Sequence, residues 1–151
     1  MKLRSLYCLG FAAALAAGCG GSASPSPSPT LDLTGVWSGR IGQAQSGAAL
    51  RLTWTAVQTG ATVSGPATLV KPSSNVPATG TMSGTLSGTQ LTLSYSVPAG
   101  AVPVYLGCTI AGTGTAVASS QTIAGTLQTT FTNCLGSGLE TPDSAQLALT
   151  R

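Results

Sequence analysis

Apolar or small residues alternate with Ser, Thr and other polar residues almost everywhere from Leu33 onward. Leu33, Trp37 and Ile41, for example, share one parity, so in an extended chain they lie on one face. A period of two is typical of half-buried β-strands, and no useful stretch of helical periodicity follows residue 30. The alternation therefore predicts an all-β domain.

The alternating segments predict eight short strands, and turn-forming pairs at 59–60, 87–88 and 119–120 separate several of them. Short, evenly spaced strands favour an antiparallel up-and-down meander. Closing it into an eight-stranded β-barrel removes the exposed edges that invite aggregation. Pro66 has no N–H to donate, so we expect the third strand to be bulged or poorly paired there.

Glycine recurs at positions that the alternation places inward, in the short phrases 63–65, 82–85, 110–113 and 123–126. Glycine weakens a strand, so its repetition needs a reason. It would permit strong curvature beside bulky Trp37 and Trp54, or it would leave an interior cavity. An eight-stranded barrel encloses just enough room for side chains or for one small ligand. Both interpretations remain open at this point.

The N-terminus has the layout of a secretory signal. Lys2 and Arg4 precede an apolar run over 6–17, which ends in small residues before Cys19. The run is shorter than the roughly 20 residues that span a bilayer. A buried helix is a poor alternative, because the Ser-Pro repeat that follows gives it nothing to pack against. An ordinary signal peptide would leave Cys19 as a free thiol.

The segment Ala14-Leu-Ala-Ala-Gly-Cys19 resembles a bacterial lipobox. The resemblance implies a signal peptide over 1–18 and a lipidated (palmitate-bearing) Cys19 that anchors the protein in the bacterial cell envelope. Gly20, rather than Asp, follows the cysteine, which in the familiar Gram-negative sorting pattern implies the outer membrane. Residues 19–30 would form a Ser/Pro-rich tether, extended or disordered, and residues 31–151 the barrel domain.

Two cysteines remain once Cys8 leaves with the signal and Cys19 takes lipid. An even remainder in an exported chain predicts a structural disulfide between Cys108 and Cys134. A metal or redox pair is the alternative, but the sequence has no histidine and no CxxC spacing.

Gly35-Val36-Trp37, at the head of the first predicted strand, resembles the GxW signature of the calycins, the small barrels of the lipocalin and avidin type. The resemblance extends over 31–151 in architecture. It implies that Arg151, at the end of the last strand, stacks on Trp37 and closes the barrel end. The interior tryptophans and polar residues that hold biotin in avidin-like proteins are missing, so biotin binding is not implied.

The domain has little of what catalysis needs. It has no histidine, its acids Asp32, Glu140 and Asp143 lie near its ends, and its one lysine, Lys71, falls in a turn. We therefore expect no enzyme, no cofactor and no metal. A net charge near +1 after the signal, without a basic stripe, makes nucleic acid a poor partner.

The leading hypothesis is a non-enzymatic, monomeric surface or periplasmic binding module that holds a small apolar ligand or presents its loops. Trp54, Tyr95 and Tyr105 are the candidate ligand-binding residues. The apolar loop 98–107 would be a contact site or lid if exposed, and a plug if folded back. The alternatives are a protein-binding barrel, such as a protease inhibitor that uses the stretch Thr30 to Leu33, and a structural envelope lipoprotein.

Overall fold

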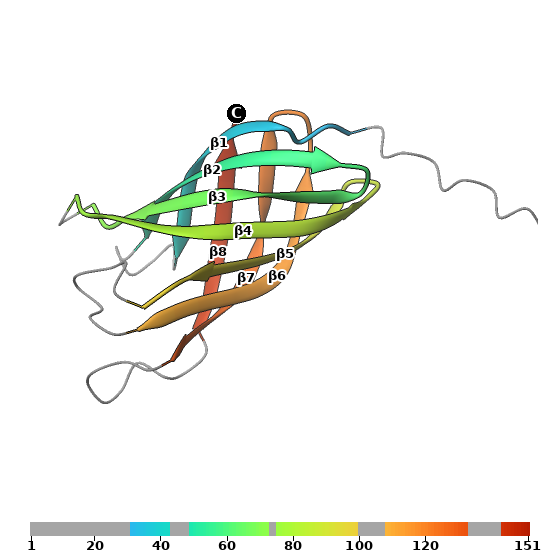
Figure 1. Ribbon diagram of the computed structural model, residues 1–151. Helices are drawn as coiled ribbons and strands as arrows, with labels where there is room; N and C mark the ends of the chain where they lie inside the picture. Colours follow the sequence, from blue (N-terminus) through green and yellow to red (C-terminus); the bar gives the residue numbers. More distant parts are fainter. Residues whose placement is uncertain (1–30, 43–48, 73–74, 100–107, 133–142) are drawn as a thin grey trace, which may run out of the picture.

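The fold is a closed barrel of eight antiparallel strands in which each strand pairs with the next and β8 pairs with β1 (Figure 1). It is seen in a computed structural model that describes residues 31–42, 49–72, 75–99, 108–132 and 143–151. No helix occurs among these residues. The all-β, eight-stranded up-and-down prediction is therefore confirmed. The strands are β1 (Gly35–Gly42), β2 (Leu50–Thr59), β3 (Thr62–Val70), β4 (Pro77–Ser87), β5 (Gln90–Val97), β6 (Thr109–Ala118), β7 (Thr122–Thr132) and β8 (Asp143–Thr150).

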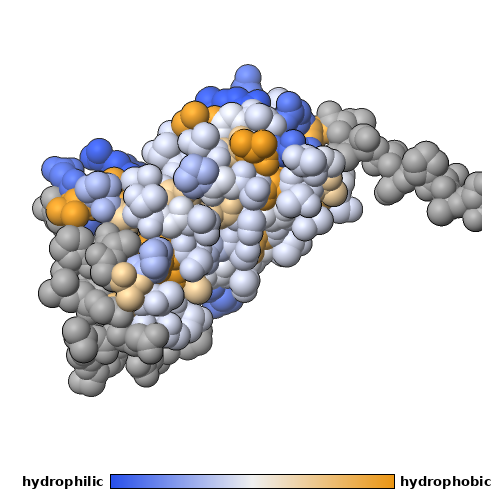
Figure 2. Space-filling model, in the orientation of Figure 1, coloured by the Kyte–Doolittle hydropathy of each residue, from blue (hydrophilic) through white to orange (hydrophobic). Residues whose placement is uncertain are grey.

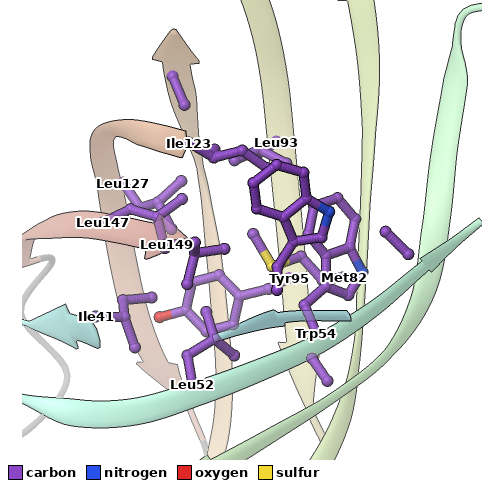
Figure 3. Close-up of a cluster of buried hydrophobic side chains, with 14 of the residues drawn as sticks. Ile41, Leu52, Trp54, Met82, Leu93, Tyr95, Ile123, Leu127, Leu147 and Leu149 are labelled. Atoms are coloured by element: carbon purple, nitrogen blue, oxygen red, sulfur yellow. The ribbon is translucent and has the colours of Figure 1, made fainter. Parts of the chain in front are cut away.

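The alternation in the sequence becomes an inner and an outer face. In β5, every second residue from Leu91 to Val97 is buried and those between are exposed. The inward residues of all eight strands form a single hydrophobic cluster (Figure 3). Its largest fully buried side chains are Trp37, Trp54, Leu33, Met82, Leu91, Leu93, Ile123, Leu127, Leu147, Leu149, Val63 and Val97.

The outer face consists largely of Ser and Thr, so much of the visible surface is pale in Figure 2, with separate hydrophobic and hydrophilic residues among the pale ones. Branched threonine suits a pleated, half-exposed strand. Cross-strand partners are often alike: one row of direct partners runs through Thr62, Thr85, Thr92, Thr115 and Thr126, from β3 to β7. The outer face is therefore polar but almost uncharged.

Several inward glycines mark places where neighbouring strands approach closely. A Cβ at Gly39 would overlap the backbone of Ala148, and one at Gly65 would overlap the carbonyl of Thr55. The space that a side chain would need is thus already occupied by backbone. Of the two interpretations of the repeated glycines, these contacts favour curvature and packing over a cavity.

Pro66 interrupts the hydrogen-bonded ladder on one side only. The pairing of β2 with β3 runs to Trp54 and Ala67 and resumes at Val57 and Ser64 in the same register. On the other side, Pro66 lies opposite Thr81 in an unbroken ladder. The strand is therefore poorly paired with β2 at this point, as expected from the missing N–H, and its register is not shifted by a bulge.

Candidate functional site

The chain enters the barrel at an end that is closed by side chains. Leu33, just before β1, is fully buried, and its carbonyl accepts a 2.8 Å hydrogen bond from Trp37 Nε1. The guanidinium of Arg151 lies over the Trp37 ring, 4.7 Å from its centroid, and also donates to the carbonyl of Thr34. A Cβ at Gly35 would lie 3.2 Å from Arg151 Nε. The structure thus brings together the two residues, Trp37 and Arg151, that the calycin resemblance pairs.

Gln58 fastens the segment before β1 to the end of β2. Its Nε2 donates to the carbonyls of Leu31 and Gly60, at 3.0 and 3.1 Å, and its Oε1 accepts from the N–H of Leu33 at 2.8 Å. One amide side chain thereby satisfies three backbone groups that no strand ladder serves. Sequence reasoning missed this residue, although it follows Leu52, Trp54 and Ala56 on the inward parity of β2, where a polar side chain is a signal of such a role.

Asp32 shapes the entry turn at the same end. The backbone N–H of Thr34 donates to Asp32 Oδ1 at 2.8 Å. This hydrogen bond is the main reason that the pKa of the Asp32 carboxyl lies below its ordinary value, and Thr34 hydroxyl bonding and the charge of Arg151 act in the same direction. The carboxylate is fully exposed and has the role of a turn residue.

Tyr95 forms a buried polar contact in the middle of the barrel. Its ring reaches across Gly112 on β6, where a Cβ would overlap it, and its hydroxyl meets Thr129 Oγ1 on β7 at 2.7 Å. Tyr95, Gly112 and Thr129 are successive direct partners in the ladder. Burial raises the pKa of the Tyr95 phenol, and the Thr129 hydrogen bond partly offsets that rise. Thr129 was not among the predicted site residues, although the alternation of β7 places it inward.

Trp54 and Tyr95, two of the three candidate ligand-binding residues, both lie inside the packed core (Figure 3). Trp54 is fully buried, and its Nε1 has no hydrogen-bond partner among the described residues. The physical reason is size: a narrow barrel is filled by its largest inward rings, and they cannot also line an opening. Tyr105, the third candidate, lies outside the described residues.

The opposite end carries the longer connections, over 43–49, 71–76, 98–108 and 133–142. We call it the loop end, and the other the closed end. A shallow apolar depression of about 10 Å³, room for about one water molecule, opens there. It is lined by Leu50, Leu69, Lys71, Val76, Ala78, Val97 and Ile110. The depression joins the ends of β3 and β5 to the beginnings of β2, β4 and β6.

Cys108 lies at this end, just before β6, where it is buried and disulfide-bonded. Cys134, its predicted partner, is outside the described residues, and so is the predicted lipidation site Cys19. The loop 98–107 was predicted to be a contact site or lid if exposed and a plug if folded back. Only residues 98–99 of this loop are described, so both interpretations stay predictions.

Within the described ranges, no group of His, Cys, Asp and Glu side chains is placed to hold a metal ion. A search of the same residues for a helix long and apolar enough to cross a membrane finds none. The arrangement offers apolar contact at the loop end and a stacked cation at the closed end. Among the residues that the structure describes, neither end places an acid, a base and a nucleophile together.

Comparison with known proteins adds no family: no family model, no curated protein and no solved structure matches this chain.

Proposed function

We propose that this protein is a lipid-anchored lipoprotein of the bacterial outer membrane whose calycin-like barrel acts, without catalysis, as a binding module at its loop end. The lipobox-like segment supports the anchor, and the stacking of Arg151 on Trp37 supports the calycin resemblance. In this proposal the protein is a monomer without a cofactor or a nucleic-acid partner.

The observation that carries the proposal is the difference between the two ends of the barrel. The tether of residues 19–30 joins the domain at Leu31, beside the closed end. The longer connections and the apolar depression lie at the other end. A domain anchored through this tether presents its loop end away from the membrane, where a ligand or partner has access. Loops on a rigid scaffold are the usual place for binding residues.

The ligand class follows from the lining of the depression. Its walls are aliphatic, with Lys71 as the one charged member. The core beneath is filled by side chains as large as Tyr95 and Trp54. Because the depression has room for about one water molecule, a small apolar molecule would place only one group in it and would otherwise lie across the rim, rather than deep inside the barrel.

The filled core also favours a second candidate, a barrel whose loop end binds another protein. Its protease-inhibitor version needs the stretch Thr30 to Leu33 to enter a protease cleft. Leu33 is fully buried, and the backbone groups of Leu31 and Leu33 are bound to Gln58. That segment is held against its own barrel, which counts against the inhibitor version and leaves the loops as the protein-binding surface.

Native mass spectrometry of the full chain, purified in mild detergent from its host's envelope, tests the proposal. We expect added acyl mass on Cys19 and, in addition, a discrete apolar adduct that is lost on denaturation. A lipidated chain with no such adduct would contradict the ligand-binding version and favour the barrel that binds another protein. A chain without acyl mass would overturn the anchor.

A matched pair of variants locates the ligand. Val76→Asp places a charge in the depression, whereas Val117→Asp places one at another exposed valine, on the outer face of β6. We expect the adduct, or the fluorescence of the apolar probe 1-anilinonaphthalene, to be lost in Val76→Asp and kept in Val117→Asp. Equal loss in both variants would contradict a site in the depression.

A further inference from the structure

Two arginines face each other on the outer surface of the barrel. Arg40 on β1 and Arg51 on β2 are direct cross-strand partners, and both side chains are exposed. They are the only basic residues within the bounds of the eight strands. Their other ladder partners are Ala148 on β8 and Val70 on β3, so no acid flanks the pair in the sheet.

This placement works against stability. Like charges directly opposite each other in an antiparallel sheet are destabilising. Among the residues that the structure describes, neither guanidinium takes part in an ion pair or a hydrogen bond that would offset the repulsion. Of the two acids whose backbone position is described, Asp32 lies at the closed end beside Thr34, and Asp143 is the first residue of β8, five residues before the Arg40 partner Ala148. A charge needed only for solubility would serve at any outward position, so solubility does not explain why these two are partners.

The neighbouring residues on the same face are hydroxyl donors. Ser38 and Thr53, two residues along β1 and β2 toward the closed end, are also direct partners, and both are exposed. Two guanidinium forks therefore stand beside two hydroxyl groups on one outward face. Guanidinium groups bind the oxygens of phosphate and similar oxyanions through paired, charge-assisted hydrogen bonds.

We propose that Arg40 and Arg51 form a binding site for a phosphate or sulfate group, with Ser38 and Thr53 as supporting donors. The anion neutralises the repulsion between the two guanidiniums, so the site gains most from a ligand that carries more than one negative charge. The site is separate from the apolar depression and takes a ligand of opposite chemistry. It stands whether or not the depression binds an apolar molecule.

Arginine-selective modification with phenylglyoxal, read out by mass spectrometry, tests the site in the full chain in mild detergent. We expect inorganic phosphate, at constant ionic strength, to protect Arg40 and Arg51 in a saturable manner. Arg151 in the same molecule serves as the internal reference, because its guanidinium is already held by Trp37 and Thr34. Equal effects of phosphate on all three arginines would overturn the proposal.

Thermal unfolding provides a second readout that does not depend on the reagent. Phosphate stabilises many proteins non-specifically, through exclusion from their surface. We therefore expect phosphate to raise the Tm of the wild type more than that of the double variant Arg40→Gln/Arg51→Gln. In Arg40→Lys/Arg51→Lys, which keeps the charge and loses the fork, the affinity should fall roughly tenfold. Identical phosphate responses in wild type and Gln variant would overturn the site.

A third experiment, with lipid vesicles, tells whether the anion is a soluble molecule or a lipid headgroup. The full chain is reconstituted into phosphatidylcholine vesicles with or without phosphatidylglycerol, and the same protection of Arg40 and Arg51 is measured. Protection by inorganic phosphate alone assigns a soluble ligand. Protection by vesicles that contain phosphatidylglycerol, but not by phosphatidylcholine alone, assigns a lipid headgroup to the same site. Protection by neither probe excludes an oxyanion site.

Discussion

At the closed end of the barrel, the connections 60–61, 88–89 and 119–121 are tight, and Leu33, Trp37, Gln58 and Arg151 interlock across the opening. At the loop end, the connections are longer, and the described residues leave an apolar depression instead of a stacked lid. The same eight strands thus end in tight, interlocked turns at the closed end and in longer connections at the loop end. The side chains that close the barrel gather where the chain enters, whereas the hydrophobic core beneath them runs through all eight strands.

Trp37→Ala should have the largest effect of the single substitutions considered. It removes a fully buried indole, the hydrogen bond to Leu33 and the ring on which Arg151 lies. We expect the free energy of unfolding to fall by about 3–5 kcal/mol, as is typical for large buried aromatic residues. Urea denaturation followed by circular dichroism measures this change.

Val76→Ala, in the depression, is the matched change at the loop end. Val76 is 36% exposed, so its truncation should cost less than about 1 kcal/mol. A loss at Val76 as large as the loss at Trp37 would break the contrast between the two ends.

Cys108→Ser comes next in size and bears on the loop end. Cys108 is disulfide-bonded just before β6, and the predicted partner, Cys134, follows β7. Opening the bond should lower the free energy of unfolding by about 2–4 kcal/mol, because the unfolded chain gains freedom. Amide hydrogen exchange should show faster opening near residues 108–110 than around Trp37. Uniform acceleration over the whole barrel would mean that the two ends are not independent.

Gly112→Ala probes the middle of the barrel, between the two ends. The new methyl group would overlap the Tyr95 ring, so the ring must move away from Thr129. Overpacking and the loss of a buried hydrogen bond together should cost about 1–3 kcal/mol. In a Tyr95→Leu background the same substitution should cost much less, because the ring is gone. Equal costs in both backgrounds would show that the clash with Tyr95 is not the cause.

The fold could be predicted from the sequence because its main determinant is local. Alternation assigns every strand an inner and an outer face, and in β5 and β8 it does so without exception among the residues whose burial is described. The pairing of Trp37 with Arg151 came from a resemblance. Alternation could not predict this contact, since the two residues are stacked in space but lie at opposite ends of the domain's sequence.

The candidate binding surface was harder to predict, because the direction in which a side chain points and its access to solvent are different properties. Trp54 and Tyr95 face inward as expected, but the volume they fill depends on Gly112 and other neighbours from distant strands. The depression likewise joins Leu50, Val76 and Ile110 from separate segments. Register brings them together, and a sequence pattern does not reveal register between strands far apart in the chain.

Arg151→Gln tests the lid of the closed end by itself. It removes the cation over Trp37 and the donor to the Thr34 carbonyl, and should cost about 0.5–2 kcal/mol. Arg40→Gln is the matched control, since it removes an equally exposed arginine that faces another arginine. In phosphate-free buffer we expect the control to be neutral or slightly stabilising. Equal losses in both variants would assign the effect to net charge instead of the stacked lid.

Asp32→Asn should have the smallest effect, visible only as a change in pH dependence. The pKa of Asp32 is lowered in the folded state, mainly by the Thr34 N–H. A carboxyl with a lowered folded pKa binds fewer protons folded than unfolded, so it adds stability above its ordinary pKa of about 4 and loses it as the pH falls below that value. Unfolding measured at about pH 5 and at about pH 3 should therefore show a larger acid loss in the wild type than in Asp32→Asn. Because the other carboxyls are common to both chains, any difference in slope belongs to the closed end. Parallel slopes would mean that the pKa of Asp32 is the same in the folded and the unfolded chain, and that its hydrogen bond to the Thr34 N–H adds no stability to the closed end.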